Sequence, residues 1–273
     1  MPLLSTEAIV LSSLRLGEDD KLITFFTLTR GKMSGVAKGA RRFKNRFGAS
    51  LEPFTQCHLL LFEKPNNKLS RISQSDILRS FWKLREGWEV IERGTQMVRL
   101  LLKITPEEQQ HPGLYHLIKE ALSFLEEGRD GHLSEILFMA HLISESGYQP
   151  RWDCCVRCDL PVVTDFSVQK IAAFFSYQEG GMLCPKCGAY STDYPSGPRT
   201  SVSAASLSFL QMISKISFQA AHLHSPNLLI KREVETLLRD YITYLIGSNK
   251  RVGKREVLTL PSPRRGAGYA PGG

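Results

Sequence analysis

No apolar run in this chain approaches the roughly 20 consecutive residues that a membrane-spanning helix needs. The first residues, MPLLSTEAIVLSS, also lack the basic region and the small-residue cleavage site of a secretory signal. These two absences argue against a membrane protein and predict a cytoplasmic location. With 273 residues, 42% of them hydrophobic, the chain is long enough for two domains and a substantial core.

The common catalytic motifs are missing as well. The sequence has no GxSxG, HExxH or GxGxxG pattern, and Gly31-Lys32 lacks the upstream glycine of a Walker phosphate-binding loop. No HxE pattern accompanies the cysteines, which argues against a zinc deaminase. We therefore predict a protein that is not an enzyme. The alternative left open is a metal-dependent nuclease whose carboxylates meet from distant positions.

Acidic residues are absent between Lys21 and Leu51, so no carboxylate near in sequence neutralises the basic residues there. The segment RGKMSGVAKGARRFKNRFG, residues 30–48, holds seven basic side chains with two phenylalanines among them. They are Arg30, Lys32, Lys38, Arg41, Arg42, Lys44 and Arg46, with Phe43 and Phe47. Such cations neutralise phosphates, and flat rings stack on unpaired bases. A charge run is often only a solvated loop, but this combination predicts a nucleic-acid-binding segment.

Positive charge is concentrated at the two ends of the chain. The net charge is +8 overall, and residues 1–80 carry 13 basic and 7 acidic side chains. Residues 248–273 carry 6 basic and 1 acidic, whereas residues 81–150 carry 7 and 11. A polyanion should therefore be recruited mainly by the N-terminal part.

Five short segments rich in β-branched and aromatic residues lie within the first 81 residues. They cover residues 7–16, 21–29, 32–37, 51–63 and 69–78, with turn signals such as Pro65-Asn66-Asn67-Lys68 between them. This pattern predicts a five-stranded, OB-fold-like β-barrel over residues 1–81. An SH3-like barrel or a small sandwich fits the same pattern.

From about Glu86 onward, apolar residues recur at helical spacing. The stripes begin at Met97, Leu114, Leu133, Phe209 and Val234, and the fourth continues to Ala220. They predict five helices in an α-helical domain over residues 82–247, which makes the fold class α+β with several domains. Residues 248–273 lack periodicity and are expected to form a disordered basic tail.

Four of the six cysteines form two CxxC pairs, Cys155 with Cys158 and Cys184 with Cys187, 25 residues apart. Two intervening residues let both thiolates of a pair reach one ion, and two pairs complete a tetrahedron. We predict a closed, structural Zn²⁺ site in a knuckle insertion at about residues 150–200. A redox-active CxxC lacks a thioredoxin-like context here, and disulfides do not suit a reducing compartment.

Neighbours of the two pairs leave some questions open. Gly188 follows the second pair and is expected to turn the backbone so that its N–H faces a sulfur, whereas Asp159 follows the first pair. Cys154 adjoins Cys155 and is an alternative ligand. Cys57 is expected to be a buried small hydrophobe.

The segments EAIVLSSLRLGEDDKLITFFTLTRGKMSGVAKGARRFKNRFGASLEPF (residues 7–54) and FSYQEGGMLCPKCG (residues 175–188) resemble the RecO family of bacterial recombination mediators. The likeness extends along the chain to about Thr259. It implies a nucleoid-associated protein that binds single- and double-stranded DNA and anneals complementary strands. With a RecR-type partner, such a protein helps load the RecA recombinase onto DNA coated by single-strand-binding protein.

The resemblance also implies roles for particular parts. The barrel would bind DNA, with the family's basic positions falling on Lys38, Arg41, Arg42, Lys44 and Arg46, and the helical domain would meet protein partners. The missing glycine after the first CxxC pair and the long basic tail depart from the family pattern. A scaffold or transcription-type protein, in which barrel and knuckles serve protein contacts, is a further alternative.

Overall fold

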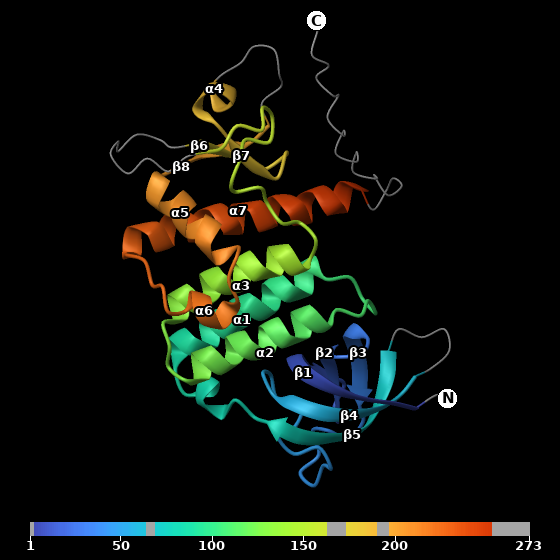
Figure 1. The fold of residues 1–273 in the computed structure, drawn as a ribbon. Coiled ribbons are helices and arrows are strands. Elements are labelled where there is room, and N and C mark those ends of the chain that lie inside the picture. Colours follow the sequence, from blue (N-terminus) through green and yellow to red (C-terminus); the bar gives the residue numbers. More distant parts are fainter. Residues whose placement is uncertain (1–2, 64–68, 163–172, 190–196, 253–273) are drawn as a thin grey trace, which may run out of the picture.

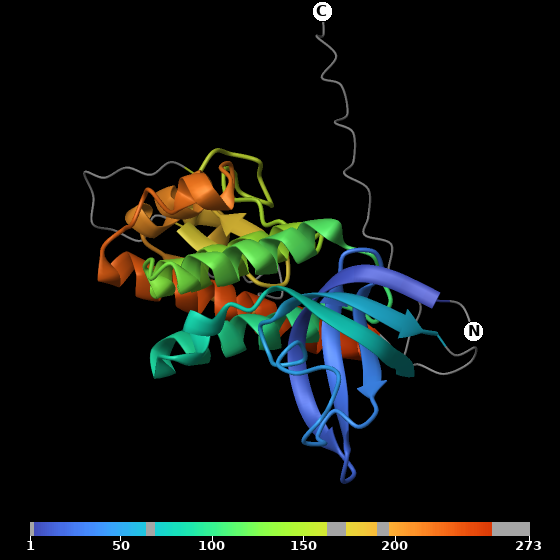
Figure 2. The same cartoon turned by 90° about the horizontal axis from the view of Figure 1, so that it is seen from below.

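The computed structural model describes residues 3–63, 69–162, 173–189 and 197–252, which form three tiers (Figure 1). A β-barrel lies at one end, helices fill the middle, and a small β-sheet lies at the other end. Figure 2 shows the barrel strands running across the direction of the neighbouring helices. No helix in the described part of the chain is both long enough and apolar enough to span a bilayer.

The barrel confirms the predicted five strands. They are β1 Leu3–Leu16, β2 Asp20–Thr27, β3 Gly31–Ala37, β4 Gln56–Phe62 and β5 Leu69–Arg79. Their order is β1-β2-β3-β5-β4, closed between β4 and β1, with β3 and β5 parallel. This is the connectivity of an OB-like barrel. One prediction was too long: the strand expected from Leu51 begins only at Gln56, because residues 51–54 form turns.

The barrel interior follows from the period-2 alternation of its strands. Inward-facing residues such as Ile23, Phe25, Leu59 and Ile72 are fully buried in a core that belongs to the barrel alone. Cys57 lies in this core, as predicted, and burial raises the pKa of its thiol to about 11.

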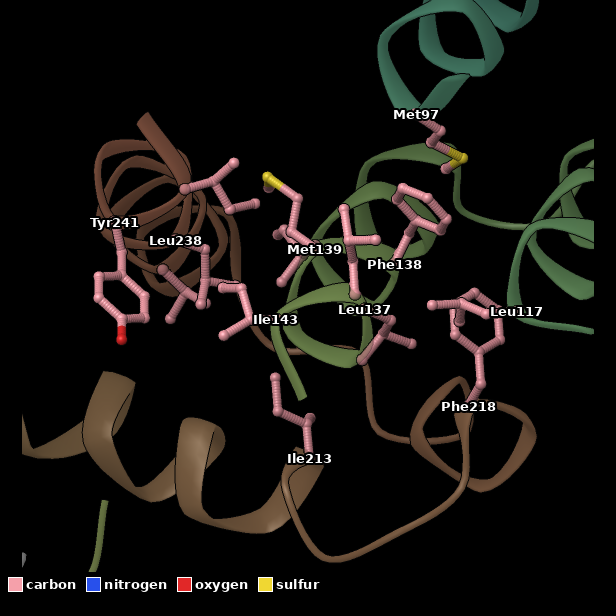
Figure 3. Packing of buried hydrophobic residues seen from close by; sticks show 14 of the residues in the cluster. Met97, Leu117, Leu137, Phe138, Met139, Ile143, Ile213, Phe218, Leu238 and Tyr241 are labelled. Carbon is pink, nitrogen blue, oxygen red and sulfur yellow. The ribbon is translucent and has the colours of Figure 1, made fainter. Parts of the chain in front are cut away.

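The helices carry the predicted apolar stripes on their buried faces. They are α1 Trp88–Ile104, α2 Pro112–Glu126, α3 Gly131–Glu145, α5 Ala204–Ile213 and α7 Leu228–Val252, with short helices η1 Trp82–Arg85, α4 Pro185–Gly188 and α6 Phe218–Ala221. α3 is central, since Leu137, Phe138 and Met139 are successive residues and all fully buried (Figure 3). Side chains from α1, α2, α6 and α7 converge on it.

Two helix boundaries differ from expectation. The stripe from Phe209 to Ala220 is split between α5 and α6, because the hydroxyl of Ser217 caps the first turn of α6 by accepting the Ala220 N–H at 3.3 Å. α7 continues to Val252, so it covers the first residues of the segment expected to lack structure. The remainder of that tail, residues 253–273, lies outside the described residues.

The small sheet consists of β6 Ala173–Ser176, β7 Gly181–Leu183 and β8 Arg199–Val202, in the order β7-β6-β8. Its apolar side is aromatic: the Phe175 ring stacks on Trp152 at 5.2 Å and meets Tyr241 of α7 edge-on at 5.1 Å, between ring centroids. The knuckle region therefore packs on α7 and shares the helical core.

Candidate nucleic-acid interface and metal centre

The basic loop, defined as residues 38–55, connects β3 to β4 and is held against the turn between β1 and β2. The Gly39 N–H donates to the Asp20 carboxylate at 2.8 Å, and the Arg41 N–H donates to the Asp19 carbonyl at 2.9 Å. The Arg41 guanidinium also donates to the carbonyls of Gly17 and Glu18. These bonds give the loop a defined shape although it has no regular secondary structure.

The loop brings together most of the predicted DNA-binding side chains. The exposed ones are Lys38, Arg41, Arg42, Phe43, Lys44 and Arg46. Phe43 is 100% exposed, which is exceptional for an aromatic ring on a protein surface. The Arg46 guanidinium lies over the Phe47 ring at 4.8 Å from the centroid.

The charge of the loop is partly neutralised in space, contrary to the expectation from sequence. Arg42 donates to one Asp19 carboxylate oxygen from Nε at 2.9 Å and from Nη2 at 2.7 Å. These hydrogen bonds to Asp19, and its negative charge, raise the pKa of Arg42. Asp19 lies outside the acid-free interval of the sequence, and the β1–β2 turn returns it to the loop.

The prediction that Phe47 offers a surface ring for base stacking is wrong. Phe47 is only 4% exposed and packs in the barrel core with Ala40 and Leu51. The Asn45 side-chain oxygen accepts the N–H groups of Phe47 and Gly48 at 3.0 and 2.8 Å, and this turn directs the ring inward. Phe43, two residues before Asn45, remains outside.

Lys32 and Arg30 lie apart from the basic loop. The Lys32 ammonium donates to the carbonyls of Leu102 and Thr105, at 3.1 and 2.7 Å, where α1 ends. Burial lowers the pKa of Lys32, and the charge of Glu107 opposes that shift. Arg30 precedes β3, at the opposite end from the loop, and pairs with Glu63 at 3.6 Å.

The second candidate site is the cluster of four cysteines. The sulfurs of Cys155, Cys158, Cys184 and Cys187 all lie within 4.8 Å of one another. Cys158 Sγ and Cys184 Sγ are 3.7 Å apart, close to the edge of about 3.8 Å that a tetrahedron with metal–sulfur bonds of about 2.3 Å requires. The four residues thus fit a tetrahedral, thiolate-bound metal ion.

The backbone around the sulfurs favours thiolates. Burial alone raises the pKa of Cys155, but the N–H groups of Cys184, Cys158 and Arg157 lower it to about 7. In contrast, burial and the neighbouring thiols raise the pKa of Cys187 to about 12. Because thiolates this close repel one another, the four can be deprotonated together only around a cation.

The structure resolves the roles of the neighbouring residues. Cys154 lies outside the four-sulfur cluster, and its sulfur accepts a hydrogen bond from Arg151 at 2.7 Å. Asp159 adopts the left-handed backbone conformation, with φ 57°, that asparagine and aspartate tolerate better than other side chains. The Gly188 N–H donates to the Cys184 carbonyl rather than to a sulfur, and an added Cβ there would lie 2.2 Å from the Phe174 ring. The glycine is therefore needed for close packing.

Sequence reasoning missed a pocket of about 170 Å³ between α3, α5 and the segment before the first cysteine pair. Its floor is apolar, formed in part by Ile143, Trp152 and Ile213, and its lining also includes His141 and Lys215. Both ring nitrogens of His141 approach backbone carbonyls, those of Leu137 and Ile216. No motif marks these residues, because they come from α3, from α5 and from loops far apart in the sequence.

Two family models match this chain. The one described as "Recombination protein O N terminal" matches residues 1–81, and the one described as "Recombination protein O C terminal" matches residues 94–254. The first match includes the barrel and the basic loop, and the second includes the four cysteines.

Individual relatives show the same likeness. The chain is 30% identical over 247 residues to the DNA repair protein RecO of Thermodesulfovibrio yellowstonii. This alignment covers 90% of this chain and 94% of that protein. It is 30% identical over 241 residues to the protein of that name from Salinibacter ruber, and this alignment covers 88% of this chain and 86% of that protein. It is 34% identical over 191 residues to the DNA repair protein RecO of Rubrobacter xylanophilus, and this alignment covers 68% of this chain and 72% of that protein.

Proposed function

Because this chain belongs to the recombination protein O (RecO) family, we propose that it serves recombinational DNA repair by binding DNA through the basic loop and annealing complementary strands. It acts as a mediator and not as an enzyme, and it binds both single- and double-stranded DNA. A Zn²⁺ ion held by Cys155, Cys158, Cys184 and Cys187 maintains the knuckle region. Since four thiolates fill the coordination sphere, that ion has a structural role.

The observation that carries the proposal is the exposure of the basic loop. Five cations and one ring project from it, namely Lys38, Arg41, Arg42, Lys44, Arg46 and Phe43. Annealing needs two polyanions side by side, and cations that contact phosphates without reading bases lower the repulsion between them for any sequence. The β1–β2 turn that supports the loop is also one of the two loops with which OB-folds bind oligonucleotides.

Protein partners complete the proposal. With a RecR-type partner, the protein helps load RecA onto DNA that single-strand-binding protein covers. That coating protein has an acidic tail with an apolar end. The pocket lined in part by Ile143, Trp152 and Ile213 is the site we propose for such a tail, because it combines apolar side chains with Lys215, which would exchange its ion pair with Asp153 for the tail.

The loop can be tested by its salt dependence. In the triple variant R41A/R42A/K44A, DNA affinity should fall for every sequence. The slope of log K against log salt should become shallower by up to about 0.9 per lost phosphate contact on duplex and about 0.7 on single strands. The control R99A/K103A removes two exposed cations from α1. An unchanged slope in the loop variant, or an equal change in the control, would contradict DNA binding by the loop.

Annealing is tested with complementary oligonucleotides coated by the cognate single-strand-binding protein, without nucleotide or magnesium. The proposal expects faster annealing than in the coated control. If only bare strands anneal faster, that result would contradict the proposed contact with the coating protein. Cleavage of either strand on addition of a divalent metal would instead favour a nuclease.

A further inference from the structure

Two tryptophans lie exposed where the barrel joins the helices. Trp82, the first residue of η1, is 54% exposed and Trp88, the first residue of α1, is 80% exposed. Trp152, the third tryptophan of the chain, is only 6% exposed and belongs to the helical core. Since tryptophan is usually well buried, two exposed rings within seven residues indicate a surface that binds something.

The backbone fixes Trp82 outside. Phe81, the residue before it, is fully buried in the core shared by the barrel and the helices, and it adopts a left-handed conformation with φ 47°. Such a conformation is rare for an aromatic residue and persists only where packing enforces it. Because Phe81 is anchored inside, the next side chain is presented to solvent.

The junction contacts the base of the basic loop. Arg85 Nη2 donates to the Pro53 carbonyl at 2.6 Å and to Thr55 Oγ1 at 2.8 Å, both near the end of that loop. The η1 segment and the loop both belong to the lower part of the molecule in Figure 1. These two bonds hold the junction against the end of the basic loop.

The local chemistry suits unpaired bases. Lys83 Nζ lies 6.0 Å from the centroid of the Trp82 ring, and among the described residues it has no carboxylate within ion-pair distance. Next to Trp88, Glu86 is exposed and disfavours phosphates, whereas the charge of the exposed Glu89 is partly offset by Arg93 at 3.1 Å. A single strand can place its phosphates toward Lys83, away from the acidic residues, and its bases on the two rings. A duplex offers no base faces for stacking.

We propose that Trp82 and Trp88 form a base-stacking surface for single-stranded nucleic acid, next to the phosphate-binding basic loop. The inference rests on the proposed function and adds the element that separates single strands from duplex. Phe43 on the basic loop is a third exposed ring. During annealing, the rings hold bases unpaired and accessible until the second strand pairs with them.

Tryptophan emission of the full-length protein tests this directly, because base stacking quenches exposed rings and leaves buried Trp152 unaffected. The probe is an oligothymidine of about 20 nucleotides, longer than the ~4–16 nucleotides that one OB-fold covers. Its binding is followed separately by anisotropy of a terminal label. A duplex of equal length is the control. The oligothymidine should quench emission, the duplex should not, and W82F and W88F should each remove part of the quenching.

Affinity supplies the second measurement. W82A and W88A should each weaken oligothymidine binding about tenfold, leave duplex binding within about twofold, and keep the salt slope. Unchanged emission with oligothymidine demonstrably bound would overturn the inference, and would leave the two rings as a surface for a protein partner. If no variant or condition gives oligothymidine binding at all, the proposed function itself fails.

Discussion

The charge of Arg42 is compensated by a carboxylate of the neighbouring turn. Its Nε and Nη2 donate to one Asp19 oxygen at 2.9 and 2.7 Å, so a phosphate that approaches Arg42 meets a cation whose charge Asp19 already offsets. Arg41 spends some of its donors on backbone carbonyls, which a phosphate need not displace. The β1–β2 turn therefore both shapes the basic loop and limits its affinity for phosphates.

We expect D19N to tighten DNA binding by about two- to fivefold at low salt and to steepen the salt slope on duplex by up to about 0.9, because Arg42 becomes free for one more phosphate. Fluorescence anisotropy over a salt series measures both quantities. E18Q is the matched control, since it removes a carboxylate from the same turn that holds no ion pair among the described residues. If E18Q has the same effect as D19N, general charge and not the Asp19–Arg42 pair is responsible.

At the residue scale, composition predicted which segment carries the basic surface but not which of its side chains face water. Lys32 lies on β3, where the pleat and the neighbouring α1 direct it to two carbonyls. Phe47 is turned inward by Asn45, a side chain whose capping role depends on the local turn. Both outcomes depend on contacts formed only after folding, so the sequence pattern could not distinguish these two residues from Lys38 and Phe43.

The knuckle region is the element that depends most on its ion. Within its described residues, the regular structure consists of three short strands and α4, whereas a structural zinc site supplies on the order of 10 kcal/mol of binding free energy. C184S should therefore lower bound zinc well below one equivalent, loosen the aromatic packing around Phe175, and change DNA affinity by no more than about twofold, since the basic loop is untouched.

Metal analysis, near-ultraviolet circular dichroism and anisotropy read out these three effects. C154S is the matched control, because the Cys154 sulfur lies outside the four-sulfur cluster. A C184S protein with full zinc and native dichroism would contradict the ligand assignment.

Helix α3 starts on a charged cap that makes its stability depend on pH. Burial raises the pKa of Asp130, but bonds from the Lys231 ammonium, the Leu133 N–H and the Ser225 hydroxyl outweigh it and lower the pKa to about 2. Because the folded pKa lies below the ordinary value of 3.8, the charged group stabilises the fold above about pH 4. That contribution is lost as the pH falls from about 4 toward 2.

We expect D130N, which keeps the cap but removes the charge, to lower the unfolding free energy at pH 7 by about 1 kcal/mol after allowance for solvent screening. D130A should lose about 1 kcal/mol more, because the Leu133 N–H loses its acceptor. The gap between wild type and D130N should close near pH 2 in urea titrations. A gap that stays constant from pH 7 to pH 3 and below would show that the ion pair contributes nothing.

At the element scale, helices predicted from a long apolar stripe are correct, whereas a helix boundary set by a single hydroxyl or a turn was not predicted. The stripes at Leu114, Leu133 and Val234 each became one buried helix face. The stripe at Phe209 did not, because a turn at residues 214–217 interrupts it and Ser217 restarts the helix as α6.

Across the whole molecule, the barrel has two apolar surfaces. One lines its interior. The other consists of Ile9, Leu11, Phe26, Phe54 and Phe81, which belong to the same core as α1, α2 and α3. Alternation along a strand predicts one buried face, so the second face could not be assigned before the helices were in place. Tyr115 of α2 closes this interface, with its hydroxyl 3.2 Å from the Glu7 carboxylate and 3.3 Å from Gln56 Nε2.

This shared core predicts that the zinc-loaded chain unfolds in one transition, although its sequence is divided into two matched regions. Separating barrel from helices would expose five large apolar side chains, each worth about 1.5–3 kcal/mol when buried. The net stability of a domain is only about 5–15 kcal/mol. The barrel alone should therefore lack a stable fold, and residues 1–81 expressed alone should bind a hydrophobic dye and melt without cooperativity.

Calorimetry of the full chain should show a single peak, and Y115F should shift that whole peak down by about 2–4 °C, because about 1 kcal/mol of interface hydrogen bonding is lost. Y244F is the control, since the Tyr244 ring on α7 lies beside Tyr177 in the knuckle region, with 6.3 Å between ring centroids. Two peaks, of which only one moves in Y115F, would mean that the barrel is an independent domain. In that case its outer apolar face would be a docking surface for the helices rather than part of one core.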